Sequence, residues 1–158
     1  MNETSLAVGA WEALFRAQVT VMRDLSECFP TGEISFNEYD VLYNLSGQPD
    51  RRARIRDLTR HLLLTQPSIS RLVDRLAARG VVEKQPDPRD ARGIVVAMTP
   101  EGYELYRRTA VSHATAIKHR VGDALEADEL STLTELCTKL RTADVDAAPG
   151  PRSAVVAP

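Results

Sequence analysis

Apolar side chains recur every three or four positions along the first part of the chain, which is the spacing of a helix with one apolar face. The run predicts a long amphipathic helix from Trp11 to Phe29. Ser35 followed by Glu38 has the spacing of a capping box, in which two side chains satisfy free backbone N–H groups. A second helix is therefore predicted to begin at Phe36.

Two short helices and a hairpin are predicted next. Ile55, Leu58 and Leu62 indicate the first helix, and residues 66–79 form the second, with Gly80 as its C-terminal stop. The apolar stripe of that second helix consists of Ile69, Leu72, Val73 and Leu76. β-Branched runs at 81–84 and 94–98 then predict a β-hairpin, whose tip would be the long polar stretch between them.

Two further helices complete the pattern. Thr99 and Pro100 are typical of a helix start, and the helix that follows can run to about Val121. Leucines between positions 130 and 140 predict a last helix. Residues 142–158 are rich in Ala, Pro and Val without a helical period, and we expect disorder there.

The order of elements predicts a fold that is mainly α with a small β-hairpin wing (α+β). Two short helices followed at once by a hairpin form a winged helix-turn-helix. We assign residues 1–34 to an N-terminal dimerisation helix, 35–99 to the DNA-binding domain, 100–141 to C-terminal dimerisation helices and 142–158 to the tail.

Charge is strongly segregated along the chain. The formal net charge is −2, but residues 51–93 hold eleven Arg and Lys against five Asp and Glu, so that this segment carries +6 and the remainder −8. Such an arrangement directs a polyanion to one face of the molecule. A solvated basic surface without a partner is the alternative.

The outward face of the helix at 66–79 carries the side chains expected to read DNA. Small hydroxyl and amide groups allow close approach to base edges, and a guanidinium can bond a guanine or a phosphate with two N–H groups. The expected contacts are Gln66, Pro67, Ser68, Ser70, Arg71 and Arg75, with Arg54 on the loop before the motif holding the DNA backbone. An ordinary solvated helix face is the alternative.

The segments TQPSISRLVDRLAARGVVEK (65–84) and PDPRDARGIVVAMTPEG (86–102) resemble the MarR family of bacterial regulators. The resemblance implies a homodimer held by the first, fifth and sixth helices, with two recognition helices in successive major grooves of double-stranded DNA. It also implies that Arg92 enters the minor groove, that Asp90 orients it together with Arg75, and that Arg89 contacts a phosphate.

We therefore expect a transcriptional regulator, acting as a repressor, that binds a pseudo-palindromic operator. The resemblance implies release by a small-molecule effector such as an aromatic acid. Trp11, Phe15 and Tyr39 could line an effector pocket, although core packing explains the same residues.

Other functions have less support in the sequence. Cys28 and Cys137 are far apart, which favours buried free thiols, and a redox response through Cys28 is an alternative within the same fold. His113 and His119 are six residues apart and cannot chelate from one helix face, so we expect solvated histidines; a metal-responsive regulator stays a further alternative.

No motif suggests catalysis or a cofactor, and we expect no enzyme. We expect no membrane partner and a cytoplasmic location, because the chain has neither a long apolar run nor the pattern of a signal peptide. A winged-helix module that binds proteins and not DNA is the alternative of a different class.

Overall fold

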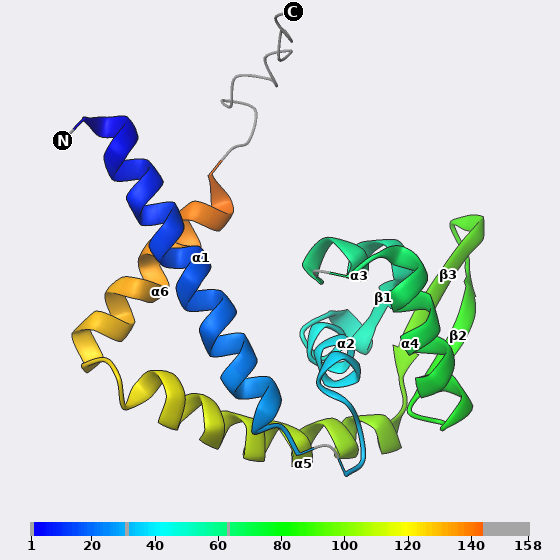
Figure 1. Ribbon diagram of the computed structural model, residues 1–158. Coiled ribbons are helices and arrows are strands. Elements are labelled where there is room, and N and C mark those ends of the chain that lie inside the picture. The colour runs from blue at the N-terminus through cyan, green and yellow to red at the C-terminus, as the bar shows by residue number, and fades with distance from the viewer. Residues whose placement is uncertain (1, 31, 63, 144–158) are drawn as a thin grey trace, which may run out of the picture. The chain divides into compact units, whose positions relative to one another are not determined.

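The computed structural model describes residues 2–30, 32–62 and 64–143, apart from the side chains of His61, Ala91 and Arg92 (Figure 1). Contacts divide the chain into one unit over Met1–Val121 and another over Gly122–Pro158. The tail predicted to be disordered lies outside the described residues, Thr142 and Ala143 excepted. Within the described part, no helix combines the length and apolar character needed to cross a membrane.

Helix α1 spans Glu3–Glu27 and starts well before the predicted position. Asn2 caps it, because its Oδ1 accepts a hydrogen bond of 2.8 Å from the backbone N–H of Ser5. The prediction began at Trp11 and missed this cap. Phe29 lies beyond the helix and is buried in the core.

Helix α2 spans Phe36–Ser46, and the predicted capping box is present. Ser35 donates its backbone N–H to Glu38 Oε2 at 2.8 Å, and the Glu38 N–H returns to Ser35 Oγ at 3.3 Å. Helices α3 (Ile55–His61) and α4 (Gln66–Ala78) follow. Gly80, with φ of 70°, takes the left-handed conformation predicted for the residue that ends α4.

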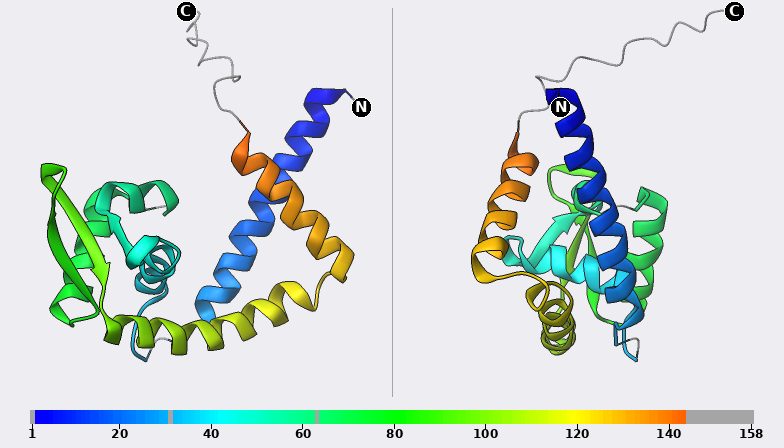
Figure 2. Two further views of the ribbon diagram at one scale, coloured as in Figure 1. Left: turned by 180° about the vertical axis from the view of Figure 1, so that it is seen from behind. Right: turned by 60° about the vertical axis from the view of Figure 1, so that its left-hand side comes forward.

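The sheet has three antiparallel strands in the order β1-β3-β2. They are β1 (Arg52–Arg54), β2 (Val82–Asp87) and β3 (Asp90–Met98). The predicted hairpin is confirmed, but the long tip is wrong, because the strands continue until only Pro88 and Arg89 connect them. Figure 2 shows this hairpin from behind, with its tip far from the start of α5.

The hydrophobic core lies where α2, α3, α4, α5 and the sheet meet. Its fully enclosed side chains include Leu42, Leu45, Leu58, Ile69, Leu76, Val73, Val82 and Val96. The stripe predicted for α4 is thus the face that joins the helix to the core. The polar face of α4 consequently points away from it.

Helix α5 (Pro100–Ile117) begins as predicted, with Thr99 as its N-cap. The Thr99 hydroxyl accepts a hydrogen bond from the Gly102 N–H at 3.0 Å and contacts the Gly80 carbonyl at 2.7 Å. A π-helical turn over Lys118–Gly122 ends this helix. Helix α6 (Ala127–Thr142) belongs to the second unit.

Candidate nucleic-acid interface

The outward face of α4 is the first component of the site. Opposite its buried stripe, the helix presents exposed or half-buried side chains: Gln66, Pro67, Ser68, Ser70, Arg71, Asp74 and Arg75. Thr65 stands at the N-cap, but its hydroxyl contacts the Ser68 hydroxyl at 2.9 Å and does not cap the backbone. Within the described residues no side chain caps the first N–H groups of α4, so they can meet an anion.

The wing is the second component. Asp87 and Asp90 flank its two-residue tip, and the exposed Arg89 lies within it. The Arg89 backbone N–H donates to Asp87 Oδ1 at 2.9 Å, which fixes the turn. Arg92 is a residue of β3, but its side chain lies outside what the structure describes.

A hollow of about 260 Å³ joins the two components. Gln66 and Ser70 of α4 line one side, and Asp90 of β3 lines the other, together with Arg54, Ile55, Arg56, Asp87, Gly93 and Ile94. The structure therefore brings together, around one concave surface, four of the residues predicted to contact DNA: Arg54, Gln66, Ser70 and Asp90.

The arginines that precede α3 interact with other residues of the protein. The Arg51 guanidinium stacks on the Tyr103 ring, with its Cζ 3.6 Å from the ring centroid. Arg54 forms an ion pair with the buried Asp87. The structure gives each of these two arginines, which were expected to hold the DNA backbone, a partner within the protein.

Arg56 connects α3 to the wing in the same way. Its Nη1 lies 4.0 Å from Asp90 Oδ2, and its Nε lies at the same distance from Asp57 Oδ1. Asp90 was expected to orient Arg92 together with Arg75. The structure gives Asp90 the guanidinium of Arg56 as a partner and places Arg75 on Glu38.

Arg75 forms an ion pair within the protein that the sequence did not suggest. Its Nε lies 3.4 Å from Glu38 Oε1, and Arg79 Nη1 lies 3.8 Å from the other carboxylate oxygen. Burial alone would raise the pKa of Glu38, but hydrogen bonds from Ser35 and the charge of Arg75 lower it on balance. This ionised carboxylate ties α4 to the start of α2.

Sequence reasoning missed Asp87, Glu38 and Tyr103 as parts of the site. Each of them interacts with an arginine distant in sequence, and no local sequence pattern indicates these pairs. The alternation of Arg52, Arg54 and Arg56 was the one available signal, since a period of two is typical of side chains on one face of a strand.

The three aromatic residues expected to line an effector pocket do not gather in one place. Trp11 and Phe15 stack on α1 with ring centroids 5.8 Å apart and are 62% and 50% exposed, so core packing is wrong for them in the single chain. Tyr39 is buried, as core packing predicts, between Phe29 and Tyr106.

Cys28 and His113 differ from expectation, whereas His119 is exposed as expected. Cys28 is exposed and Cys137 half-buried, so the prediction of buried thiols is wrong for Cys28. His113 is buried against Phe29, Phe36 and Tyr39 and is not solvated. No group of three His, Cys, Asp or Glu side chains suited to a metal ion occurs within the described ranges.

The helices and wing define a winged helix-turn-helix protein, and comparisons with known proteins show which family it resembles. The profile of the MarR family matches residues 33–93. The MarR family regulator Sco3205 of Streptomyces coelicolor, solved in complex with DNA, superposes with a TM-score of 0.72 at 27% identity, over 89% of this chain and 88% of that one. Residues 33–93 thus match the MarR family, and the fold of the described chain is similar to that of a MarR family regulator.

Two further relatives extend the comparison. The multiple antibiotic resistance protein MarR of Salmonella typhimurium is 30% identical over 84 residues, which are 53% of this chain and 58% of that protein's length. The fold is also that of Bordetella bronchiseptica BpsR, whose DNA binding is regulated by 6-hydroxynicotinic acid, with a TM-score of 0.70 at 22% identity over 84% of this chain and 93% of that one. The family consists of transcription regulators, in agreement with the expectation that this chain is not an enzyme.

Proposed function

We propose that this chain is a sequence-specific DNA-binding transcription regulator that works as a homodimer. The observation that carries the proposal is the concave surface between Gln66 and Ser70 of α4 and Asp90 of the wing. It combines an uncapped helix N-terminus, small polar side chains and nearby arginines. These groups suit base edges and phosphates at once.

The two halves of the surface have different tasks in this proposal. Gln66, Pro67, Ser68, Ser70 and Arg71 read the major groove. Arg89 and Arg92 of the wing meet the backbone and the minor groove, where a narrow groove attracts an arginine by its negative potential. The DNA complex of Sco3205 supports this use of the fold.

The homodimer is supported by apolar side chains that lie exposed on the helices outside the DNA-binding motif. On α1 they include Leu6, Trp11, Leu14, Phe15, Val19 and Met22, and on α6 they are Leu133, Leu136 and Leu140. Exposed apolar surface of this extent is typical of an interface between subunits. Two-fold symmetry then requires an operator with two related half-sites about one helical turn apart.

We propose further that the regulator is a repressor in the cytoplasm, released from DNA by a small aromatic acid. Regulation of BpsR by 6-hydroxynicotinic acid supports an effector of this chemical class. A thermal-shift screen of aromatic acids, followed by gel shifts with any acid that stabilises the protein, tests the effector separately from DNA binding.

Selection of duplexes from a random library by the purified chain tests the central proposal. We expect a pseudo-palindromic consensus, protected over two half-sites in a footprint. Arg71→Ala should weaken binding by about 5- to 150-fold for each half-site of that duplex, because a bidentate contact to a base contributes about 1–3 kcal/mol. Tyr43→Ser is the control, since Tyr43 is 56% exposed and lies on α2, outside both the polar face of α4 and the proposed dimer helices.

A chain that retains no duplex at low salt would refute the proposal and would favour the winged-helix module that binds proteins. Recovery of unrelated sequences, equally bound by the Arg71→Ala variant, would leave only non-specific attraction to a polyanion and would also contradict it.

A further inference from the structure

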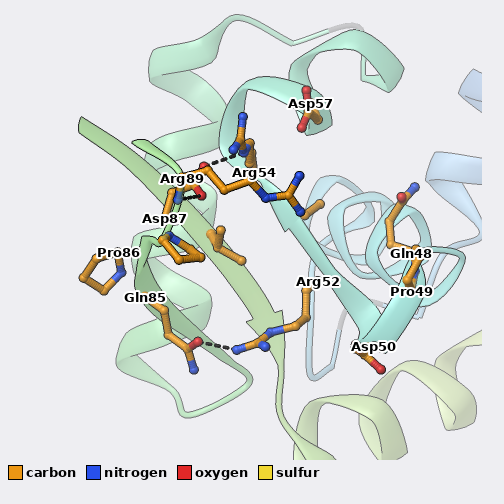
Figure 3. A pocket seen from close by; sticks show the side chains of 13 residues that line it. Gln48, Pro49, Asp50, Arg52, Arg54, Asp57, Gln85, Pro86, Asp87 and Arg89 are labelled. Carbon is orange, nitrogen blue, oxygen red and sulfur yellow. Dashed lines mark hydrogen bonds and ion pairs between the residues drawn. The ribbon is translucent and has the colours of Figure 1, made fainter. Parts of the chain in front are cut away.

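Two arginines of β1 reach across the central strand of the sheet to residues of β2. Arg52 and Arg54 pair in register with Ala97 and Val95 of β3, so their side chains share one face with these small residues. Arg52 donates a hydrogen bond to Gln85, and Arg54 forms an ion pair with Asp87. Figure 3 shows both contacts at the edge of a cavity of about 740 Å³.

The Arg54–Asp87 pair lies where the sheet changes from three strands to two. β1 ends at Arg54, opposite Val95, whereas β2 and β3 continue to Asp87 and Asp90. Beyond this point the wing is an isolated two-stranded ribbon, which is marginally stable by itself in water. Arg54 is the last residue of β1, so it is the last residue of that strand that can hold the wing.

Asp87 is built into this position. The residue is only 5% exposed, and its Oδ2 pairs with the Arg54 guanidinium, whose charge compensates the carboxylate there. A Cβ placed on Gly93 would lie 2.9 Å from Asp87 Cβ, so the missing side chain of Gly93 makes room for the carboxylate. The other carboxylate oxygen holds the tip through the N–H of Arg89.

We infer that Arg54 and Asp87 are positioning residues for DNA binding, and that Arg54 acts through Asp87 to direct the wing and does not itself bind a phosphate. The inference rests on the proposed function and changes the role that the sequence suggested for Arg54. The side chain of Arg54 is only 21% exposed, and that of Asp87 is 2% exposed. Moving Arg54 to a phosphate would leave a buried carboxylate without its partner, which is costly.

Charge alone and positioning make opposite predictions for Asp87→Asn. Removing a negative charge from a DNA-binding surface strengthens attraction to the phosphates. If the Arg54–Asp87 ion pair positions the wing, its loss misplaces the wing and weakens binding to DNA. The direction of the change therefore separates the two explanations.

The test measures the affinity of four variants for the duplex selected by the wild-type chain. Asp87→Asn and Arg54→Gln should each weaken binding about tenfold, and the double variant should bind no more weakly than the worse single variant. The double variant leaves no unpaired buried charge. Its affinity can therefore be measured even if one of the single variants does not fold. Asp50→Asn is the matched control: it removes one negative charge from the same cavity, and Asn accepts the left-handed conformation of that residue (φ of 53°).

Hydrogen exchange of the free protein provides a readout independent of DNA. In Asp87→Asn the wing amides, including that of Arg89, should exchange faster than in the wild type, while the amides of α2 and α4 keep their protection. Asp50→Asn should leave both sets unchanged.

Equal or tighter duplex binding by Asp87→Asn would overturn the inference, as would independent, additive losses in the double variant. Unchanged exchange in the wing would overturn it even if the wild type binds no duplex, in which case the proposed function has failed separately.

Discussion

Trp11 lies on the exposed face of α1 and provides the sharpest test of the homodimer. The residue is 62% exposed, and complete burial of an aromatic side chain removes about 150–250 Å² from water, so about 150 Å² of Trp11 remains for a partner to cover. At about 25 cal/mol per Å² this surface corresponds to about 4 kcal/mol. Since part of it is offset by ordering and incomplete burial, about 2 kcal/mol per subunit is a realistic contribution.

In a two-fold dimer each substitution occurs twice, so Trp11→Ser should cost about 4 kcal/mol of association free energy. That is roughly a thousandfold increase in the dissociation constant of the dimer. Sedimentation equilibrium over a range of protein concentrations measures this constant directly.

Tyr43→Ser is the matched control, because Tyr43 is 56% exposed but lies on α2, outside the proposed dimer helices. It should leave the dissociation constant unchanged. A wild-type chain that is monomeric at all concentrations, or a Trp11→Ser variant that dimerises as tightly as the wild type, would refute the assignment of this face.

Three further outcomes follow from the packing and the titratable groups. Gly102→Ala should destabilise the fold by about 3 kcal/mol in urea unfolding, despite the better helix propensity of alanine, because the new Cβ would lie 2.0 Å from the Val81 carbonyl oxygen. Burial lowers the pKa of His113, so the unfolded chain binds the proton first as the pH falls, and the stability of the fold should decrease below about pH 6.5. Urea unfolding at pH 7.5 and 5.5 should show this loss of stability, and His113→Phe should make the loss smaller. Glu38→Gln should cost about 1 kcal/mol at pH 7 by the same measurement, a small effect because its partner Arg75 is largely exposed to solvent; a loss persisting at a pH where Glu38 is protonated would contradict the ionic explanation.

The elements that sequence predicted well are those whose signals are local. A capping box at Ser35 and Glu38 needs only four neighbouring residues, and the stop at Gly80 needs only one. Both were placed correctly. The apolar stripe of α4 likewise depends only on helical spacing, and it matches the buried residues.

The elements that sequence missed depend on pairing across the chain. The three residues of β1, Arg-Ala-Arg, carry no β propensity of their own and form a strand because β3 offers free backbone groups beside them. The outer part of the wing was interpreted as a loop for the same reason, since polar residues and prolines conceal strands held by backbone hydrogen bonds.

The candidate site shows the same division. The face of α4 was found from its polar residues, and the structure joins it to the wing as expected. The internal partners of Arg51, Arg54 and Arg75 were not found, because an arginine that binds DNA and one that braces the protein look alike in sequence.

Thr99 connects three elements around the candidate nucleic-acid interface. The Thr99 hydroxyl contacts the Gly80 carbonyl at 2.7 Å and its backbone N–H donates to Val81 at 3.2 Å, so the end of α4, the start of the wing and the start of α5 are joined within three residues. These hydrogen bonds couple any movement of α5 to the end of α4 and the start of the wing. Helix α5 has 18 residues and a length of about 27 Å, so a rigid tilt of about 5° about its far end would move α4 by about 2 Å, which is comparable to the length of a hydrogen bond.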